Sequence, residues 1–447
     1  MFFGIFATGV KVGANLLLLP ILLSKLPTAD LALWWQFGAL GGFANLADFG
    51  FGATIARVYS YLWAGAEDFD AEGLRPPPVS REPNLPRIRQ LSATVRYFYW
   101  LLAMAATLVI AVIGTFLLRK TVAAVADPQL AWMAWAGQVF LIGYGLGTSR
   151  WLLACQGLGR MREVQAAYLY GGLTYVALAA VLLLNGWGLL GLLVATFARE
   201  LIARNYCRRV YHAAVPKVSA LQERPDKEIL KRLWPNASKL GVLSIGTFLL
   251  SNGSVLISGQ LKDVSVTASF GLTAQIGGFL TNFAALWLVV KWPAISMLRM
   301  QGRLQEMSIL FARRLAFTMG TYVVLATLVA LVGNWLLALK GTHTRLLPAP
   351  LLIFYFIYLA QQLFYVQFGA LAYSENVVPF FKIGILTGMG MFILSFLMTW
   401  AFGLWGMLLA PLIAESAYSS WFTVRRGFRG QPLTARELLK AAVYGHP

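Results

Sequence analysis

Acidic side chains, cysteines and histidines are scarce in this chain. Only 12% of its 447 residues are charged, with 18 acidic against 37 basic side chains, whereas a soluble domain carries about 25% charged residues. Two cysteines, Cys155 and Cys207, give no disulfide framework, and three scattered histidines give no metal-ligand spacing. The P-loop pattern G-x-x-x-x-G-K-[ST] does not occur. We therefore expect no bound metal or cofactor, no ATP hydrolysis and no enzyme activity.

Long apolar runs dominate what is present. Hydrophobic residues make up 58% of the chain, and its mean hydropathy is +0.66. A run of 18 or more apolar residues is long enough to span a bilayer as a helix. The first run starts at Phe2 without a basic region or cleavage site, so we interpret it as a retained helix. The sequence predicts an all-α, polytopic membrane protein with twelve transmembrane helices at 3–24, 31–63, 93–118, 129–157, 164–184, 189–207, 239–260, 265–298, 309–338, 348–372, 378–400 and 403–424.

Two long connections indicate how these helices are grouped. Residues 66–92 contain "RPPPVSREPNLPR" and should be irregular, because proline lacks the N–H that a helix needs. Residues 208–238 contain "QERPDKEILKRLW", which predicts a short amphipathic helix at the membrane surface. This second connection separates two pseudo-symmetric six-helix lobes. The predicted parts are an N-terminal lobe (1–207), a cytoplasmic linker (208–238), a C-terminal lobe (239–424) and a cytoplasmic tail (425–447).

A weak internal repeat supports this division. Asp48 and Arg57 correspond to Asn282 and Lys291, so that each half has a polar residue followed nine positions later by a cation. Transporters are often built from two similar halves. The two halves would enter the membrane in the same sense, which predicts a pseudo-twofold axis along the membrane normal.

The distribution of basic residues predicts the orientation. Lysines and arginines concentrate in the even-numbered connections and the tail, as at Arg87, Arg208 and Arg426. The positive-inside rule then places both termini in the cytoplasm. The net charge of +19 also suits a surface of anionic lipid. These basic residues flank spans instead of forming one domain, so nucleic acid is not an expected partner.

Four of the cations inside predicted spans are candidate site residues: Lys11, Arg57, Arg150 and Lys291. A charge at the centre of a bilayer costs about 2.5–3.5 kcal/mol on insertion scales. Each of the four lies roughly 10 Å below the predicted cytoplasmic interface, at 1.5 Å per helical residue. They predict a ring around a central cavity that holds a phosphate or pyrophosphate, whose oxygens match the fork of arginine. The alternative is snorkelling, in which each side chain extends to the head groups.

Two acids lie deepest in the predicted spans, and each has two interpretations. Asp48, which is followed by Gly50 and Gly52, either stabilises a glycine-rich bend through hydrogen bonds or titrates to couple transport to an ion gradient of H⁺ or Na⁺. Glu415 has the same two interpretations. The candidates for sugar contacts are the amides Asn15, Asn45, Gln138, Gln275, Asn282 and Gln361.

The segment "LALWWQFGALGGFANLADFGFGATIARVYSYLWAGA" resembles the second helix of bacterial O-antigen and exopolysaccharide flippases. These belong to the multidrug/oligosaccharidyl-lipid/polysaccharide (MOP) exporter superfamily. The matching pattern is D-x-G-F…R, found here as Asp48, Gly50, Phe51 and Arg57. The resemblance implies two six-helix lobes around a cationic cavity, and alternating access that moves an undecaprenyl-pyrophosphate-linked oligosaccharide between leaflets. Only Arg57 falls on the pattern; the role of Lys11, Arg150 and Lys291 rests on their depth.

The leading hypothesis is therefore a flippase of lipopolysaccharide or other polysaccharide biosynthesis in the bacterial inner membrane. Its expected partners are the lipid-linked oligosaccharide, membrane lipids and other polysaccharide-assembly proteins. A cation-coupled multidrug exporter of the same superfamily is the alternative within transport, although luminal cations disfavour cationic cargo. From other classes, the alternatives are a membrane glycosyltransferase or polymerase, which the short and acid-poor outer loops disfavour, and a scaffold of an export complex.

Overall fold

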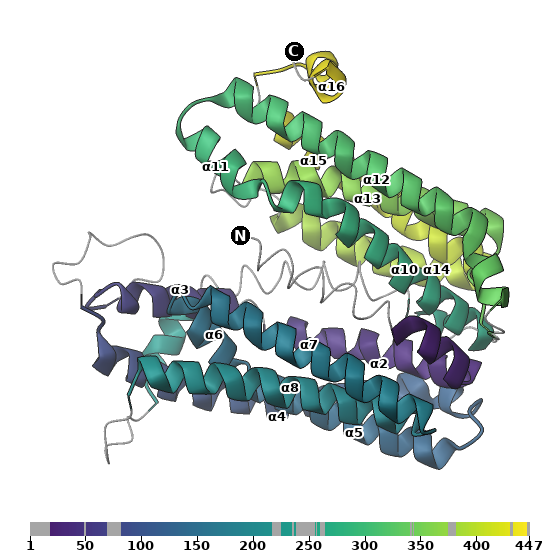
Figure 1. The fold of residues 1–447 in the computed structure, drawn as a ribbon, viewed down its shortest axis with the longest axis horizontal. Coiled ribbons are helices and arrows are strands. Elements are labelled where there is room, and N and C mark those ends of the chain that lie inside the picture. Colours follow the sequence, from purple (N-terminus) through teal and green to yellow (C-terminus); the bar gives the residue numbers. More distant parts are fainter. Residues whose placement is uncertain are drawn as a thin grey trace. The chain divides into compact units, whose positions relative to one another are not determined.

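The structure is a computed structural model, and it describes residues 18–48, 51–68, 82–216, 225–234, 237, 255, 257–259, 264–339, 342, 344–373, 381–429 and 432–444. The regular secondary structure of these residues is helical, with no strand among them (Figure 1). The predicted all-α, polytopic fold is confirmed. Seven helical stretches of the described chain are long and apolar enough to cross a membrane: Leu85–Val122, Pro128–Gly157, Met161–Leu184, Val264–Val289, Leu304–Leu339, Ala349–Ala372 and Leu386–Arg429.

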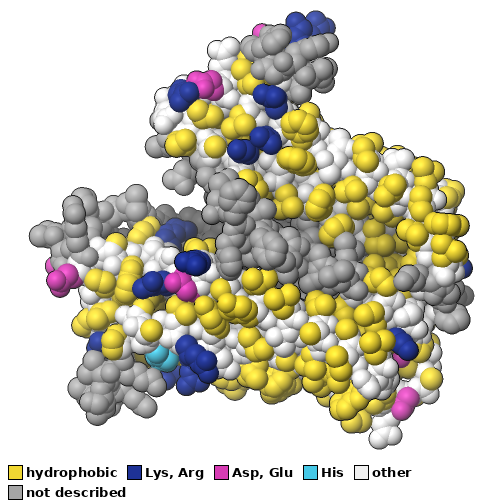
Figure 2. All heavy atoms as spheres, in the orientation of Figure 1, with side chains coloured by type: hydrophobic (Ala, Val, Ile, Leu, Met, Phe, Trp, Pro, Cys, Tyr) yellow, Lys and Arg dark blue, Asp and Glu magenta, His cyan; other side chains and the backbone are white. Residues whose placement is uncertain are grey.

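The surface of these helices is apolar, as expected of lipid-facing spans. In Figure 2, hydrophobic side chains cover the long faces of the helices, while Lys and Arg side chains gather near helix ends. Leu108 on one long helix is 68% exposed, and Leu331 on another is 76% exposed. Contiguous exposed apolar surface of this kind marks contact with lipid or with another apolar partner.

The chain forms two compact units, Met1–Phe248 and Leu249–Pro447. Unit 1 contains α2 (Thr28–Ala47), α3 (Phe51–Trp63), α4 (Leu85–Val122), α5 (Pro128–Thr148), α6 (Arg150–Gly157), α7 (Met161–Leu184) and α8 (Gly188–Ala214). Side-chain caps mark the starts of α4 and α5, where Asn84 and Asp127 accept hydrogen bonds from the backbone N–H groups of Arg87 and Leu130. Each cap satisfies an N–H that has no partner within its helix.

The predicted linker packs onto unit 1. α8 continues beyond the expected limit at 207 as far as Ala214. Residues 227–234 are helical, as predicted for this connection, with Ile229 and Leu233 buried and Lys231 exposed. Ile229 and Leu233 join an apolar cluster that also contains residues of α3, α4, α6 and α8. The exact limits of the predicted lobes, linker and tail stay predictions.

Two helices of unit 1 that the sequence predicts as continuous are broken. The predicted helix 31–63 is interrupted between α2 and α3, next to Asp48. The predicted helix 129–157 is interrupted at Ser149, whose hydroxyl donates to the carbonyl of Leu146 at 2.7 Å. The Ser149 N–H bonds to the same carbonyl at 3.2 Å, which is a tighter turn than the α-helical pattern. The polar side chain at each break therefore competes for backbone groups of the helix.

Unit 2 contains α10 (Val264–Val289), α11 (Trp292–Met300), α12 (Leu304–Leu339), α13 (Ala349–Tyr373), α14 (Phe381–Ala414), the π-helix η1 (Glu415–Ser419), α15 (Ser420–Arg429) and α16 (Ala435–Tyr444). The predicted helix 265–298 is broken at residues 290–291, and Pro293 lies in the first turn of α11. Proline has no N–H to donate to the preceding turn, so the α10 hydrogen-bond pattern cannot continue through it.

The connection between the last two predicted spans is a sharp reversal within α14. Gly403 has φ 58° and ψ −134°, which is not helical. A Cβ on Gly406 would lie 1.9 Å from the carbonyl oxygen of Met398. In a straight helix these two residues would be about 12 Å apart along the axis. The chain therefore folds back at Gly403, next to the predicted boundary between 378–400 and 403–424.

Candidate functional site

Asp48 lies at the break between α2 and α3 and is held by two donors. Its Oδ2 accepts a hydrogen bond from the backbone N–H of Gly52 at 2.9 Å, and its Oδ1 accepts one from the hydroxyl of buried Tyr99 on α4. A Cβ on Gly52 would lie 2.7 Å from Asp48 Oδ2, so glycine leaves room for this contact. The carboxylate thus caps the first turn of α3. The first interpretation from sequence, a hydrogen-bonded acid at a glycine-rich bend, describes this geometry.

Arg57 lies on the exposed face of α3. The opposite face of α3 carries Ile55, Tyr59 and Leu62, which pack in the core of unit 1. Within the described part of the chain, the Arg57 guanidinium makes no hydrogen bond or ion pair, while its backbone carbonyl accepts from the Ser60 hydroxyl at 2.7 Å. Arg57 is therefore an exposed charged group within a predicted span, with no partner for its guanidinium among the described residues.

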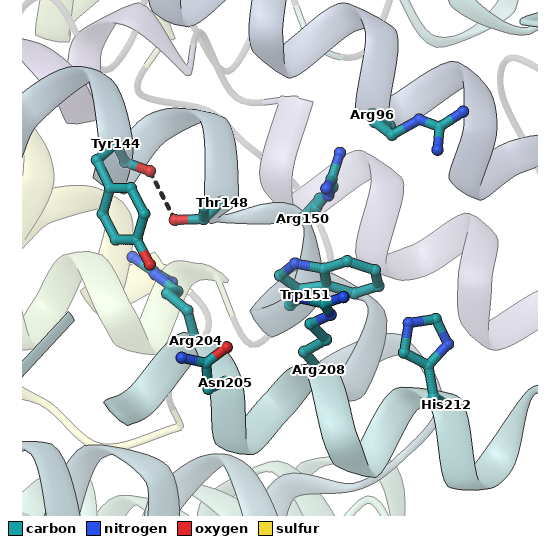
Figure 3. Close-up of a pocket in the computed structure, with 9 residues that line it drawn as sticks. All are labelled: Arg96, Tyr144, Thr148, Arg150, Trp151, Arg204, Asn205, Arg208 and His212. Atoms are coloured by element: carbon teal, nitrogen blue, oxygen red, sulfur yellow. Dashed lines mark hydrogen bonds between the residues drawn. The ribbon is translucent and has the colours of Figure 1, made fainter. Parts of the chain in front are cut away.

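Arg150 lies in a pocket with three other arginines, none of which is among the predicted site residues. The pocket has a volume of about 370 Å³ and is lined by residues of four helices: Arg96 on α4, Tyr144 and Thr148 on α5, Arg150 and Trp151 on α6, and Arg204, Asn205, Arg208 and His212 on α8 (Figure 3). Arg57 is not among the lining residues. The structure groups Arg150 with these arginines, whereas the ring that joins it to Lys11, Arg57 and Lys291 stays a prediction.

Trp151 is the centre of this pocket. The Arg150 guanidinium lies 4.7 Å from the centroid of the Trp151 ring, and the Arg208 guanidinium lies 6.0 Å from it. The ring of His212 is 5.2 Å from the same indole, centroid to centroid. Figure 3 shows the indole between these basic side chains. Cation–π attraction thus holds two guanidinium groups on one aromatic ring without neutralising them.

Several guanidinium nitrogens in the pocket are buried without a partner. Nε and Nη1 of Arg150, and Nε and Nη1 of Arg204, have no hydrogen bond to any described group. Only Nη2 of Arg204 has an acid, Glu200, at 3.0 Å. A buried donor without a partner costs free energy, and more so for a charged group. The pocket therefore presents unsatisfied positive donors that an anion would satisfy.

Lys291 and two of the predicted amides of unit 2, Gln275 and Asn282, lie along α10 and the break that follows it. Lys291 is half-buried at the start of α11, and its ammonium group has no bond to a described residue. Asn282 is exposed, and its Nδ2 donates to the carbonyl of Gly278 at 2.7 Å, one turn earlier. Gln275 is half-buried on α10. Contact of Gln275 and Asn282 with a sugar stays a prediction.

Glu415 is buried in unit 2 at the first residue of the π-helix η1. Its Oε1 accepts hydrogen bonds from the hydroxyl of Tyr358 at 3.2 Å and from Nε2 of Gln362 at 3.3 Å, both on α13. None of the described lysines and arginines pairs with it. Glu415 is therefore a carboxyl group held by neutral donors in the packed interior, where a π-helix bulge locally widens the turn.

Three further predicted site residues have no described side chain. Lys11 and Asn15 lie outside the described residues. Asn45 lies in α2, but its side chain is not among those that the structure describes. Their roles stay predictions.

Sequence reasoning missed Arg96, Arg204, Arg208 and Trp151. One signal was present: Arg204, Arg208 and His212 follow one another at four-residue spacing, which places them on one face of a helix. The residues from α4 and α6 that complete the pocket lie far away in sequence, so spacing alone does not connect them.

The fold matches solved structures of membrane transporters. The chain is similar to the lipid II flippase MurJ in an inward closed conformation (TM-score 0.65, 12% identity, covering 99% of this chain and 90% of that chain). It is also similar to an inward-facing multidrug resistance MATE family transporter of the MOP superfamily (TM-score 0.58, 14% identity, 94% and 92% covered). A third is a MOP superfamily transporter from Pyrococcus furiosus described as having a binding pocket of reverse polarity (TM-score 0.51, 14% identity, 94% of each chain).

No family model matches the chain, and no curated protein matches it. The three structures cover nearly the whole of this chain, so the likeness extends through both units. The chain has the fold of the MOP-superfamily transporters, as the resemblance of its second predicted helix implied.

Proposed function

We propose that this protein is a flippase that moves an undecaprenyl-pyrophosphate-linked oligosaccharide across the bacterial inner membrane by alternating access. The fold supports a transporter, and one of the similar structures is a flippase of a lipid-linked substrate. The proposal includes cytoplasmic termini and the use of the substrate in O-antigen or other surface polysaccharide assembly.

The observation that carries this proposal is the sign of the accessible charges within the predicted spans. Arg57 is exposed, and Lys291 is half-buried with no described partner. The two acids are occupied: Asp48 caps α3, and Glu415 is buried against Tyr358 and Gln362. A transported head group would therefore meet cations whose charge is not neutralised within the described chain. Such a surface suits pyrophosphate, and it disfavours the organic cations of a multidrug exporter.

Coupling to an H⁺ or Na⁺ gradient is part of the proposal. Because Asp48 has a capping role, Glu415 is the better candidate for an acid that changes protonation during transport. Its described polar partners are neutral, so protonation of its carboxyl would not break an ion pair with them.

The test is transport by the purified full chain in proteoliposomes. The substrate is undecaprenyl pyrophosphate carrying a labelled oligosaccharide, and a membrane-impermeant glycosidase reports how much has reached the opposite leaflet. We expect Arg57→Gln to lower the initial rate at least tenfold, because a charge-assisted hydrogen bond contributes about 1.5–3 kcal/mol. Arg119→Gln is the matched control, since Arg119 is an exposed arginine in the last turn of α4.

Two results would contradict the proposal. The first is wild-type protein that leaves the labelled lipid in its original leaflet while exporting an organic cation such as ethidium; this would favour the multidrug exporter. The second is an Arg57→Gln rate equal to that of Arg119→Gln. The scaffold alternative is tested in cells by measuring surface polysaccharide. If the protein is a scaffold, the Arg57→Gln variant should keep surface polysaccharide at the normal level.

A further inference from the structure

The arginine pocket of unit 1 has chemistry that the transport proposal does not use. Its described lining includes four arginines and no acidic residue, and two of these arginines have buried nitrogens without a described partner. We propose that this pocket binds the phosphate group of a lipid head group, with an acyl chain of the same lipid lying along the exposed face of α4.

The lining of the pocket has the chemistry that a phosphate group needs. The guanidinium groups of Arg150 and Arg208 both lie near the ring of Trp151, and both residues line the same pocket (Figure 3). Guanidinium groups form bidentate hydrogen bonds to phosphate oxygens. Asn205 adds a neutral amide to the lining, which suits the hydroxyl groups of a glycerol or sugar. Basic pockets between transmembrane helices on the cytoplasmic side are suited to anionic lipid head groups.

The pocket lies at a depth that lipid head groups occupy. Arg204 and Arg208 lie about 24 Å and about 30 Å from the start of α8 at Gly188, at 1.5 Å per residue. On α4, Arg96 lies about 35 Å from Arg119, which exceeds the ~30 Å thickness of the hydrocarbon core. These lengths put the pocket at one membrane interface, where lipid phosphates are found. The predicted topology assigns this interface to the cytoplasmic side.

An apolar stripe on the surface of α4 leads away from the pocket. Arg96, Trp100, Met104 and Leu108 follow one another at four-residue spacing on α4, so they share one helix face. Trp100, Met104 and Leu108 are 45%, 61% and 68% exposed. The charged end of this stripe lines the pocket, and its apolar part extends toward the opposite end of α4. A lipid with a charged head and an extended chain matches both parts.

The pocket is separated from the exposed cation of α3 by the core of unit 1. Cys207 and Tyr211 of α8 are buried in the apolar cluster that also packs against α3. Arg204, Arg208 and His212 lie on the neighbouring face of α8 and line the pocket. Head-group binding in the pocket is therefore independent of whether Arg57 contacts a transported substrate.

The experiment measures lipid binding to the purified full chain by native mass spectrometry. Dioleoyl phosphatidylglycerol, dioleoyl phosphatidylcholine and undecaprenyl pyrophosphate are titrated separately. We expect at least one of the two anionic lipids to bind about tenfold tighter than phosphatidylcholine, and Arg150→Gln and Arg208→Gln each to remove most of that difference. Arg208 is exposed, so we expect the Arg208→Gln variant to keep the packing of the core. Arg119→Gln, an exposed arginine of α4 that does not line the pocket, is the control and should leave the binding of all three lipids unchanged.

The two anionic lipids distinguish the sources of the phosphate. If the pocket variants weaken only phosphatidylglycerol, the ligand is a membrane phospholipid; if they weaken only undecaprenyl pyrophosphate, the pocket is a subsite for the transported lipid. Either result supports a lipid phosphate in the pocket. Equal binding of all three lipids, or full anionic-lipid affinity in both pocket variants, would overturn the inference. A chain that fails to transport but keeps this pattern would refute the flippase and leave the pocket standing.

Discussion

The two units interrupt the helices that the predicted internal repeat pairs, but they do so at different positions and in different ways. In unit 1 the break between α2 and α3 lies at Asp48, whose carboxylate caps the N–H of Gly52. The paired residue in unit 2, Asn282, lies within continuous α10 and bonds back to the Gly278 carbonyl. The break in unit 2 comes later, at 290–291, just before Pro293.

Each unit thus has a break in the helix concerned, but the position and the cause of the break differ. An acid followed by glycines ends α2, because the side chain replaces a hydrogen bond that the helix would have made. A proline ends α10, because its missing N–H leaves a hydrogen bond unmade. The cations are placed differently as a result: Arg57 lies within α3, whereas Lys291 lies at the break itself. The break at Asp48 depends on hydrogen bonds of a side chain to two helices, α3 and α4. The break before Pro293 depends on a missing backbone N–H.

The largest expected effect is at Asp48. Asp48→Ala leaves the Gly52 N–H and the buried Tyr99 hydroxyl without their acceptor, and each costs about 1–3 kcal/mol of stability. Thermal unfolding in detergent measures the loss. Asp48→Asn keeps an oxygen acceptor for Gly52 and should recover much of it. If Asn unfolds at the same temperature as Ala, the cap does not explain the break.

A second prediction concerns the reversal within α14. Gly403→Ala places a Cβ on a backbone with φ 58°, which costs about 1–3 kcal/mol of stability. Gly390→Ala, also in α14, is the matched control. A Cβ there meets nothing within 4 Å, so it should be neutral or stabilise by up to about 1 kcal/mol. Equal unfolding temperatures for the two variants would show that Gly403 is not needed for the turn.

Replacement of Glu415, the buried acid of unit 2, should have a smaller effect on stability. Glu415→Gln keeps an oxygen that accepts from Tyr358, so we expect a loss of about 1 kcal/mol or less. If Glu415 couples transport, the same variant should lose the dependence of transport rate on an imposed pH gradient. Proteoliposome transport with and without the gradient measures this. A gradient dependence equal to that of wild type would assign Glu415 a structural role only.

The smallest expected stability effect is at the proline break. Pro293→Ala restores an N–H that can join the α10 pattern, and we expect a change of under about 1 kcal/mol. The geometric effect should be larger. Spin labels at exposed Phe283 and Met297 should move toward the ~21 Å separation of a continuous helix. An unchanged distance would mean that packing, and not proline, sets the break.

The bend at Asp48 was one of two interpretations that the sequence left open, and its hydrogen bonds explain why a glycine follows at Gly52. The break at Ser149 could not be predicted, because a serine inside an apolar run is also tolerated in a continuous helix. The π-helix at Glu415 was missed for a similar reason: its sequence "ESAYS" differs little from α-helical sequence.

The residues of the candidate site also divide into those that the sequence identified and those that it did not. Arg57 and Lys291 were identified because a charge in a long apolar run is costly wherever the helix packs. Arg96, Arg204 and Arg208 were overlooked because they lie near the ends of the predicted spans 93–118 and 189–207, where basic residues are common and indicate topology. Their role as a group depends on which helices are neighbours.

The sequence by itself determined that this chain is a bundle of membrane-spanning helices, because backbone groups in lipid must be satisfied within each span and long apolar runs can do so only as helices. Only the tertiary structure decided which charges act together. Arg96, Arg150 and Arg208 come from three helices, and their guanidinium groups share a pocket because α4, α6 and α8 pack around it. Such packing depends on side-chain contacts between distant segments, which no local pattern records.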